Sequence, residues 1–227
     1  METETYPLLT AVDVRVLGCL LEKAATTPDA YPLTLNSLLL ACNQKSNRHP
    51  VVDYDEEMVL ESIDDLRQAK LVFRVDVAGS RVSKYRHNSD ELLGLDKAGK
   101  ALLTVLLLRG AQTLGELRTR CERMHAFATT EEVEVALKEI SEDVERPLWM
   151  KLPRSAGKKE ERYQHLFSGP PDPTLAAESS DATTEPHPEP MSTRDARIQQ
   201  LEETVTTLQA ELGELTTAFN EFRKEFQ

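Results

Sequence analysis

Cysteine is scarce in this chain of 227 residues, which contains only Cys19, Cys42 and Cys121. The number is odd, the three lie far apart, and no Cys-x-x-C pair occurs. A disulfide framework or a thiol redox motif needs paired cysteines, so the sequence indicates neither. We therefore expect a reducing compartment, which for this chain means the cytoplasm.

Long hydrophobic runs and a signal peptide are also missing. The longest apolar stretch, near residues 102–108, is far shorter than the roughly 20 residues that a membrane-spanning helix needs. Residues 1–7 lack the basic start and the apolar core of a secretory signal. We expect a soluble, cytoplasmic protein that makes no contact with a membrane.

The sequence has no recognisable catalytic or cofactor motif. None of the nine glycines belongs to a phosphate-binding loop, and the five histidines are scattered. Cys121 and His125 are spaced like half of a metal site, but no second pair accompanies them. We therefore expect no enzyme activity, no metal and no cofactor.

The net charge of −12 is distributed unevenly. Residues 171–227 contain 12 acidic and 4 basic residues, so this segment supplies −8 of the total. Residues 1–170 contain 27 acidic and 23 basic residues and are nearly balanced. The low isoelectric point therefore does not exclude an anionic partner for the first part of the chain.

The first part of the chain has the pattern of three helices. A capping box of Thr10 and Asp13 precedes an apolar stripe that ends at Leu21. Two further helices follow the N-cap residues Thr34 and Asp55.

A β-hairpin is predicted after the third of these helices. The β-rich runs 72–77 and 82–86 are separated by Gly79 and Ser80, a two-residue turn signal. Three helices followed by a hairpin predict a winged helix over residues 6–88.

The same order of elements recurs further along the chain. Helices are predicted after Asp96, Thr113 and Thr129, and the last two carry Glu116 and Glu132 at the capping-box position. A second hairpin with Trp149 in its core-facing strand follows. This repeat predicts a second winged helix over residues 94–168.

The last part of the chain differs from both copies. Residues 169–193 hold six of the twelve prolines and five acidic but no basic residues, which predicts a disordered acidic linker. Residues 194–227 predict a coiled-coil helix, because apolar residues recur there with alternating spacings of three and four. These residues are Ile198, Leu201, Val205, Leu208, Leu212, Leu215, Phe219, Phe222 and Phe226.

The predicted fold class is therefore mainly α with small β-hairpin wings (α+β), in two tandem winged-helix domains plus a C-terminal coiled-coil helix. The heptad predicts that the chain binds to itself, most simply as a dimer. The alternative is that the C-terminal helix folds back on the domains.

Several long runs of residues resemble the YceH-like family. They are 20–23 (LLEK), 26–28 (TTP), 41–48 (ACNQKSNR), 81–85 (RVSKY), 106–113 (LLLRGAQT), 115–118 (GELR) and 162–169 (RYQHLFSG). The sequence departs from the family pattern at His49 and Leu114. The resemblance implies bacterial proteins of unassigned function with two winged helices and a helical tail, and it brings no catalytic residue or ligand with it.

The third helix of each predicted domain has the wrong charge for reading DNA. Residues 55–70 carry six acidic and two basic residues, and residues 129–145 carry seven and one. A carboxylate stripe is repelled by phosphates and releases no counterions on binding. The usual docking of this helix in the major groove is therefore disfavoured.

Basic residues gather elsewhere, in two candidate patches. The first comprises Lys45, Arg48, Arg74, Arg81, Lys84 and Arg86, in the loop 43–50 and the first wing. The second comprises Arg118, Arg120 and Arg123, with Arg109 and His125 nearby in the sequence. Either patch contacts nucleic acid or an acidic protein surface, or else it balances the acidic helices within the fold.

Two functions remain open from the sequence. One is a non-enzymatic adaptor that assembles protein partners and is oligomerised by its C-terminal helix. The other is a DNA-associated transcriptional regulator that binds through its basic wings and the loop of Lys45 and Arg48. For that loop we favour a structural role, because Asn and Ser side chains commonly bond to neighbouring backbone.

Overall fold

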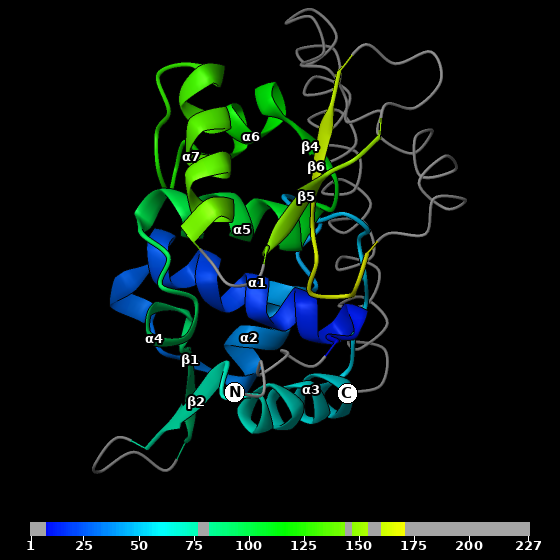
Figure 1. Ribbon diagram of the computed structural model, residues 1–227. Helices are drawn as coiled ribbons and strands as arrows, with labels where there is room; N and C mark the ends of the chain where they lie inside the picture. The colour runs from blue at the N-terminus through cyan, green and yellow to red at the C-terminus, as the bar shows by residue number, and fades with distance from the viewer. Residues whose placement is uncertain (1–7, 77–81, 144–146, 154–159, 171–227) are drawn as a thin grey trace, which may run out of the picture. The chain divides into compact units, whose positions relative to one another are not determined.

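The computed structural model describes residues 8–76, 82–143, 147–153 and 160–170, drawn as the coloured ribbon in Figure 1. The chain divides into two units, Met1–Ala177 and Glu178–Gln227, and every described residue lies in the first. The coiled-coil prediction, most of the linker prediction and Arg81 lie outside the described residues. No helix in the described ranges is both long and apolar enough to cross a membrane.

The structure combines α-helices with small antiparallel sheets, in agreement with the predicted α+β class. The first half of the described chain contains α1 (Ala11–Thr26), a 3₁₀ turn (Pro28–Ala30), β1 (Leu33–Thr34), α2 (Leu35–Cys42), α3 (Glu56–Gln68), β2 (Val72–Val75) and β3 (Lys84–His87). The three strands form one sheet in the order β1-β3-β2, with Leu33 opposite Tyr85.

The second half repeats this order. It contains α5 (Lys97–Arg109), β4 (Gln112–Thr113), α6 (Leu114–Cys121), α7 (Thr130–Asp143), β5 (Trp149–Lys151) and β6 (Arg162–His165). Its sheet has the order β4-β6-β5, with Gln112 opposite Tyr163. The last strand of each half carries a buried tyrosine and a buried histidine two residues later, Tyr85 with His87 and Tyr163 with His165.

A short helix that the sequence analysis missed, α4 (Ser89–Leu93), connects the halves. Five residues are too few to display a helical period of apolar side chains, so its sequence carries no clear signal. Gly94 follows it with φ +60°, a left-handed conformation that suits glycine and ends the helix.

The predicted helix caps are formed in the structure. The Thr10 hydroxyl accepts from the Asp13 backbone N–H, and the Asp13 carboxylate accepts from the Thr10 N–H at 2.9 Å. Thr113 and Glu116 make the same reciprocal pair. At α7 the box is altered, because Glu132 accepts from the N–H of Ala128 rather than from that of Thr129.

The helix α1 is buried on all sides rather than along the single predicted stripe. Every residue from Asp13 to Leu21 is buried. One side of α1 contacts α2 and α3, and α5 packs against it as well. Figure 1 shows α1 and α5 together in the middle, with α2 and α3 on one side and α6 and α7 on the other.

One hydrophobic core therefore runs through both halves. Backbone hydrogen bonds also join them, since the N–H of His49 donates to Leu108 at 2.9 Å and the N–H of Leu9 donates to Phe167 at 2.7 Å. Trp149 lies in this core as predicted, 3% exposed, and its indole N–H donates to the carbonyl of Leu137 at 3.0 Å.

Candidate functional site

Arg48 lies inside the protein rather than on a binding surface. Its side chain is 0% exposed, and its two terminal nitrogens donate to the two carboxylate oxygens of Glu22 in α1, at 3.1 and 2.7 Å. The guanidinium also donates to the carbonyls of Ala41 and Asn47 and to the side-chain oxygen of Gln44. These bonds tie the loop 43–50 to two helices.

The Glu22 carboxylate remains charged in this interior position. Burial opposes its ionisation, but the hydrogen bonds and charge of Arg48, together with the charge of Lys23, outweigh burial and lower the pKa of Glu22. Its side chain is 12% exposed, and Lys23 approaches it to 3.1 Å. The pair also joins two of the sequence runs that carry the family resemblance, residues 20–23 and 41–48.

Two further side chains hold the same loop, as the structural interpretation of its polar residues predicts. The Asn43 side chain donates to the carbonyl of Tyr54 at 2.7 Å and accepts from the N–H of Tyr54 at 2.9 Å. Arg15, buried in α1, donates to the carbonyls of Cys42 and Pro50 at 3.0 and 2.6 Å. Sequence reasoning missed Arg15, although an arginine between Val14 and Val16 in an apolar stripe is a recognisable signal.

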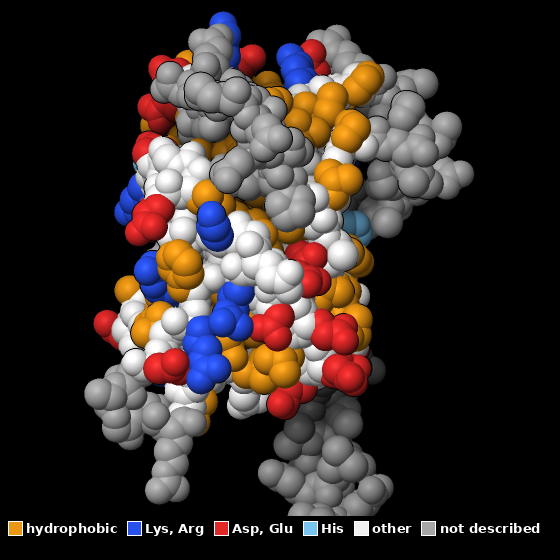
Figure 2. Space-filling model, turned by 60° about the horizontal axis from the view of Figure 1, so that its bottom comes forward, with side chains coloured by type: hydrophobic (Ala, Val, Ile, Leu, Met, Phe, Trp, Pro, Cys, Tyr) orange, Lys and Arg blue, Asp and Glu red, His pale blue; other side chains and the backbone are white. Residues whose placement is uncertain are grey.

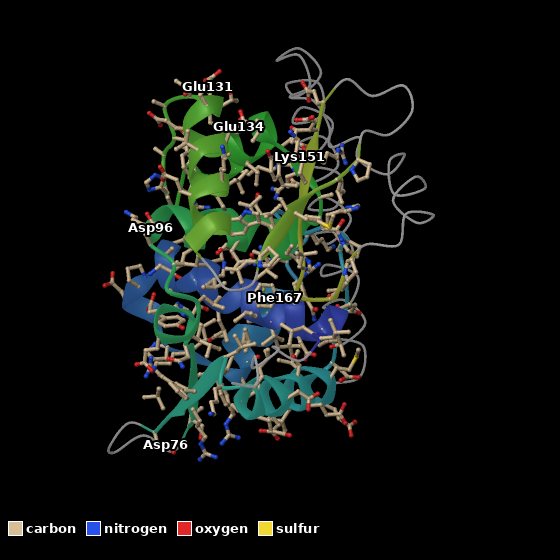
Figure 3. The ribbon with its side chains drawn as sticks, viewed as in Figure 1. Asp76, Asp96, Glu131, Glu134, Lys151 and Phe167 are labelled. Atoms are coloured by element: carbon tan, nitrogen blue, oxygen red, sulfur yellow. The ribbon has the colours of Figure 1, made fainter. Side chains whose placement is uncertain are left out.

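The remaining members of the first candidate patch differ in what they contact. Arg74 donates to the carboxylate of Asp76 at 3.0 Å, near the end of β2, where Figure 3 labels Asp76. The guanidinium of Arg86 lies 4.9 Å from the centre of the Phe73 ring. Lys84 is half-buried and Lys45 is exposed. The structure thus does not place Arg48 on one surface with the wing residues.

In the second candidate patch, the side chains point to different partners. Arg118 is exposed and donates to the carbonyl of Ala128 at 3.0 Å. Arg120 donates to the side-chain oxygen of Gln112, and its other terminal nitrogen lies 3.5 Å from Glu116. Arg120 and Arg123 line a pocket of about 60 Å³, and Arg109 from α5 lines it with them.

The outer faces of α3 and α7 combine carboxylates with exposed apolar side chains. On α3, Glu57, Glu61 and Asp64 are exposed, and so are Met58 (38%) and Leu60 (41%). Figure 2 brings this end of the described region forward and shows acidic and hydrophobic side chains intermingled on it, with Lys and Arg side chains beside them.

The corresponding helix of the second half has the same character. Figure 3 labels Glu131 and Glu134 on α7, and both are exposed beside Val135, which is 52% exposed. The solvent-facing sides of α3 and α7 thus both carry exposed carboxylates.

The described residues contain no group of three or more His, Cys, Asp or Glu side chains that could hold a metal ion. In the half-site of Cys121 and His125, Cys121 is buried and His125 is half-buried, and burial raises the pKa of the Cys121 thiol to about 12. Cys19 and Cys42 are buried too.

Comparison with known proteins places the chain in a family. A family model described as "Protein of unknown function, DUF480" matches residues 9–158. A UPF0502 protein of Geobacter sulfurreducens is 49% identical over 220 residues, which cover 97% of this chain and 99% of that protein. A UPF0502 protein of Cellvibrio japonicus is 48% identical over 216 residues, covering 95% and 94%. These names assign no activity. The match confirms the resemblance to a bacterial family of unassigned function, and the chain belongs to the DUF480/UPF0502 family.

Proposed function

We propose that this chain is a tandem winged-helix protein that acts as a non-enzymatic adaptor and docks a basic, partly apolar segment of a protein partner on α3. The order helix, strand, helix, helix, strand, strand occurs twice, and each last strand pairs between the other two. This is the connectivity of a winged helix, whose third helix and wing usually make the contacts.

The proposal rests on the side chains that α3 exposes to solvent. Leu60 lies three residues after Glu57 and four before Asp64, so an apolar side chain is flanked by carboxylates on one helical face. Arg67 pairs with Asp64 at 2.8 Å, so the charge around Leu60 is mainly but not entirely negative. Apolar side chains beside charge that is mainly of one sign fit a partner with matching apolar residues and opposite charge.

The same face argues against a duplex as the partner of α3. Phosphates repel carboxylates, and affinity for nucleic acid begins with counterions that basic side chains release. The buried position of Arg48 and the pairing of Arg74 with Asp76 also leave fewer basic groups available to a phosphate backbone. The alternative function is binding of DNA through Lys45 and the first wing, and the experiment below distinguishes it from the adaptor function.

The test uses a basic amphipathic peptide as the probe, titrated calorimetrically into the full chain at low salt. We expect binding that is lost when Glu57, Glu61 and Asp64 are all changed to Lys. The matched control reverses three exposed carboxylates on other segments, Asp29, Glu91 and Glu122, and we expect it to bind the peptide almost as well as the original chain.

A parallel titration with random-sequence duplex DNA discriminates the alternative. The regulator would replace the adaptor if the chain binds DNA tightly and the logarithm of its binding constant falls steeply with the logarithm of salt concentration. This binding should then be lost when Arg81, Lys84 and Arg86 are changed to Ala. A peptide that binds equally to the α3 variant and to its control would also contradict the proposal.

A further inference from the structure

Two of the three cysteines lie together in the core of the first half. Cys19 belongs to α1 and Cys42 is the last residue of α2, and both residues are 0% exposed. The Cys42 thiol donates a hydrogen bond to the sulfur of Cys19. We propose that Cys19 and Cys42 are a redox-sensitive pair, which a peroxide converts reversibly into a disulfide bond between α1 and α2. This modification goes beyond the adaptor function.

Hydrogen bonds of two arginines fasten α2 to α1 at this pair. Arg15 lies one turn before Cys19 on the same face of α1, and it donates to the carbonyl of Cys42 at 3.0 Å. Glu22 lies three residues after Cys19 on that face and binds both terminal nitrogens of Arg48. Arg48 donates in turn to the carbonyl of the residue before Cys42, at 3.1 Å. The end of α2 is therefore held on both sides of Cys19, and the folded protein keeps the two thiols together.

The surroundings of the pair make Cys19 the more reactive thiol. Burial opposes its ionisation, but the hydrogen bond from Cys42 and the positive charges of Arg48 and Arg15 outweigh burial and lower the pKa of Cys19. The hydrogen bond to Cys19 and burial both raise the pKa of Cys42. Burial raises the pKa of Cys121 as well, to about 12. Because the thiolate is the nucleophile, Cys19 is the attacking thiol and Cys42 the one that completes the disulfide.

The reaction balances with hydrogen peroxide as the oxidant. The Cys19 sulfur attacks one peroxide oxygen, the O–O bond breaks, and the released hydroxide leaves as water with the proton that Cys19 has given up. The Cys42 sulfur then attacks the sulfenic acid at Cys19, so that an S–S bond forms and the S–O bond breaks. The second hydroxide leaves as water with the Cys42 proton. Two thiols have then lost two electrons and two protons to one peroxide, and a small thiol restores them by exchange.

The experiment treats the reduced full chain with hydrogen peroxide, blocks the remaining thiols with N-ethylmaleimide in denaturant and counts them by mass spectrometry. We expect one blocked cysteine in each oxidised chain, Cys121, and a peptide in which Cys19 and Cys42 are linked. Dithiothreitol should restore all three thiols. Because the link closes a loop between helices that already pack together, the oxidised chain should melt at a temperature higher by about 5–15 °C.

Alanine variants separate the roles of the two thiols. After peroxide treatment of Cys42→Ala, dimedone, which traps sulfenic acids, should label Cys19. The matched variant Cys19→Ala should leave Cys42 unlabelled, and the control Cys121→Ala should form the linked peptide like the original chain. Labelling of Cys42 in Cys19→Ala would overturn the assignment of Cys19 as the attacking thiol.

Three results on the original chain would overturn the pair itself. Links that join Cys121 to either partner as often as Cys19 to Cys42 would show that only unfolded chains are oxidised. Three blocked thiols after an hour in millimolar peroxide would show that the pair does not react. A disulfide that lowers the melting temperature would show that the folded protein does not hold the two sulfurs in place for the bond.

Discussion

Arg48 and Glu22 form a buried ion pair in which each charge depends on the other. We expect Arg48→Ala to lower the free energy of unfolding by about 3–5 kcal/mol, since it leaves the Glu22 carboxylate buried without its main partner. Arg118→Ala, on the surface, should change it by less than about 0.5 kcal/mol. Urea denaturation followed by circular dichroism measures both.

The cause of that loss can be isolated with a second variant. Replacing Glu22 by Leu and Arg48 by Met together removes both charges and keeps apolar volume, so it should destabilise the protein less than Arg48→Ala alone. If the double variant is no more stable than Arg48→Ala, the orphaned carboxylate is not the cause of the loss, and the loss comes from what both variants lack, such as the hydrogen bonds of Arg48 to Ala41 and Gln44.

His165 should make the stability depend on pH in a defined window. Burial lowers the pKa of His165 to about 4, and its ordinary value in an unfolded chain is about 6.5. Between these values the unfolded chain binds a proton that the folded protein does not. Stability is therefore complete above about pH 6.5 and falls as the pH drops to about 4, by up to about 3 kcal/mol.

The measurement compares denaturant titrations at pH 7 and pH 4 for the original chain and for His165→Met. We expect the variant to lose less stability on acidification. His87, whose pKa burial also lowers, is present in both proteins, so its contribution cancels in the comparison. The same loss in both proteins would exclude His165 as a source of the pH dependence.

At the scale of elements, Gly18 sets how closely α1 approaches α5. A Cβ at this position would lie 2.8 Å from a methyl carbon of Leu108 and 3.1 Å from the Cβ of Leu107. Alanine favours a helix over glycine by about 1 kcal/mol, but crowding in a packed core costs about 1–3 kcal/mol. Because two residues of α5 obstruct the new atom, we expect Gly18→Ala to be destabilising overall.

Thermal unfolding of Gly18→Ala, Leu108→Ala and the double variant measures this contact. The double variant should be more stable than the sum of the single changes implies, because the shortened side chain at position 108 makes room for the new methyl group. Strict additivity, or a stabilising Gly18→Ala, would mean that α5 moves aside at little cost.

Features within one helix could be predicted from the sequence, because they involve residues three or four apart. The capping boxes at Thr10 and Thr113 and the core position of Trp149 are of this kind. The sequence analysis placed only one stripe of α1 in the core, although Val14, Gly18 and Cys19 lie outside that stripe and are also apolar or small, as in a helix that is buried all round. What one sequence does not reveal is which helix covers the other side of α1. The covering helix, α5, begins 71 residues after the end of α1.

The candidate site was less predictable for the same reason. Composition indicated basic groups around Arg48 and Arg120, but only the tertiary structure brings Arg48 to Glu22, 26 residues earlier, and Arg109 to Asn47, 62 residues earlier. Side-chain hydrogen bonds between such distant residues leave no periodic signal in one sequence. A basic residue in a loop therefore does not reveal whether it faces water or a buried carboxylate.

At the scale of the whole molecule, the two halves share one hydrophobic core. The buried residues of both form one cluster, and α1 of the first half packs against α5 of the second. Backbone hydrogen bonds from His49 to Leu108 and from Leu9 to Phe167 join the halves as well.

The remaining prediction concerns residues 198–226, outside the described part of the chain, and it rests on the sequence. Nine apolar residues occupy every a and d position of four heptads and the first a position of a fifth, from Ile198 to Phe226. A lone helix would leave that stripe in water, and Ile and Val at the first a positions with Leu at d favour a parallel dimer. Light scattering should give a dimeric mass for the full chain at tens of micromolar and a monomeric mass for a version that ends at Thr193. A monomeric full chain would mean that the stripe packs against its own chain instead, and an unchanged mass on truncation would move the interface to residues 1–193.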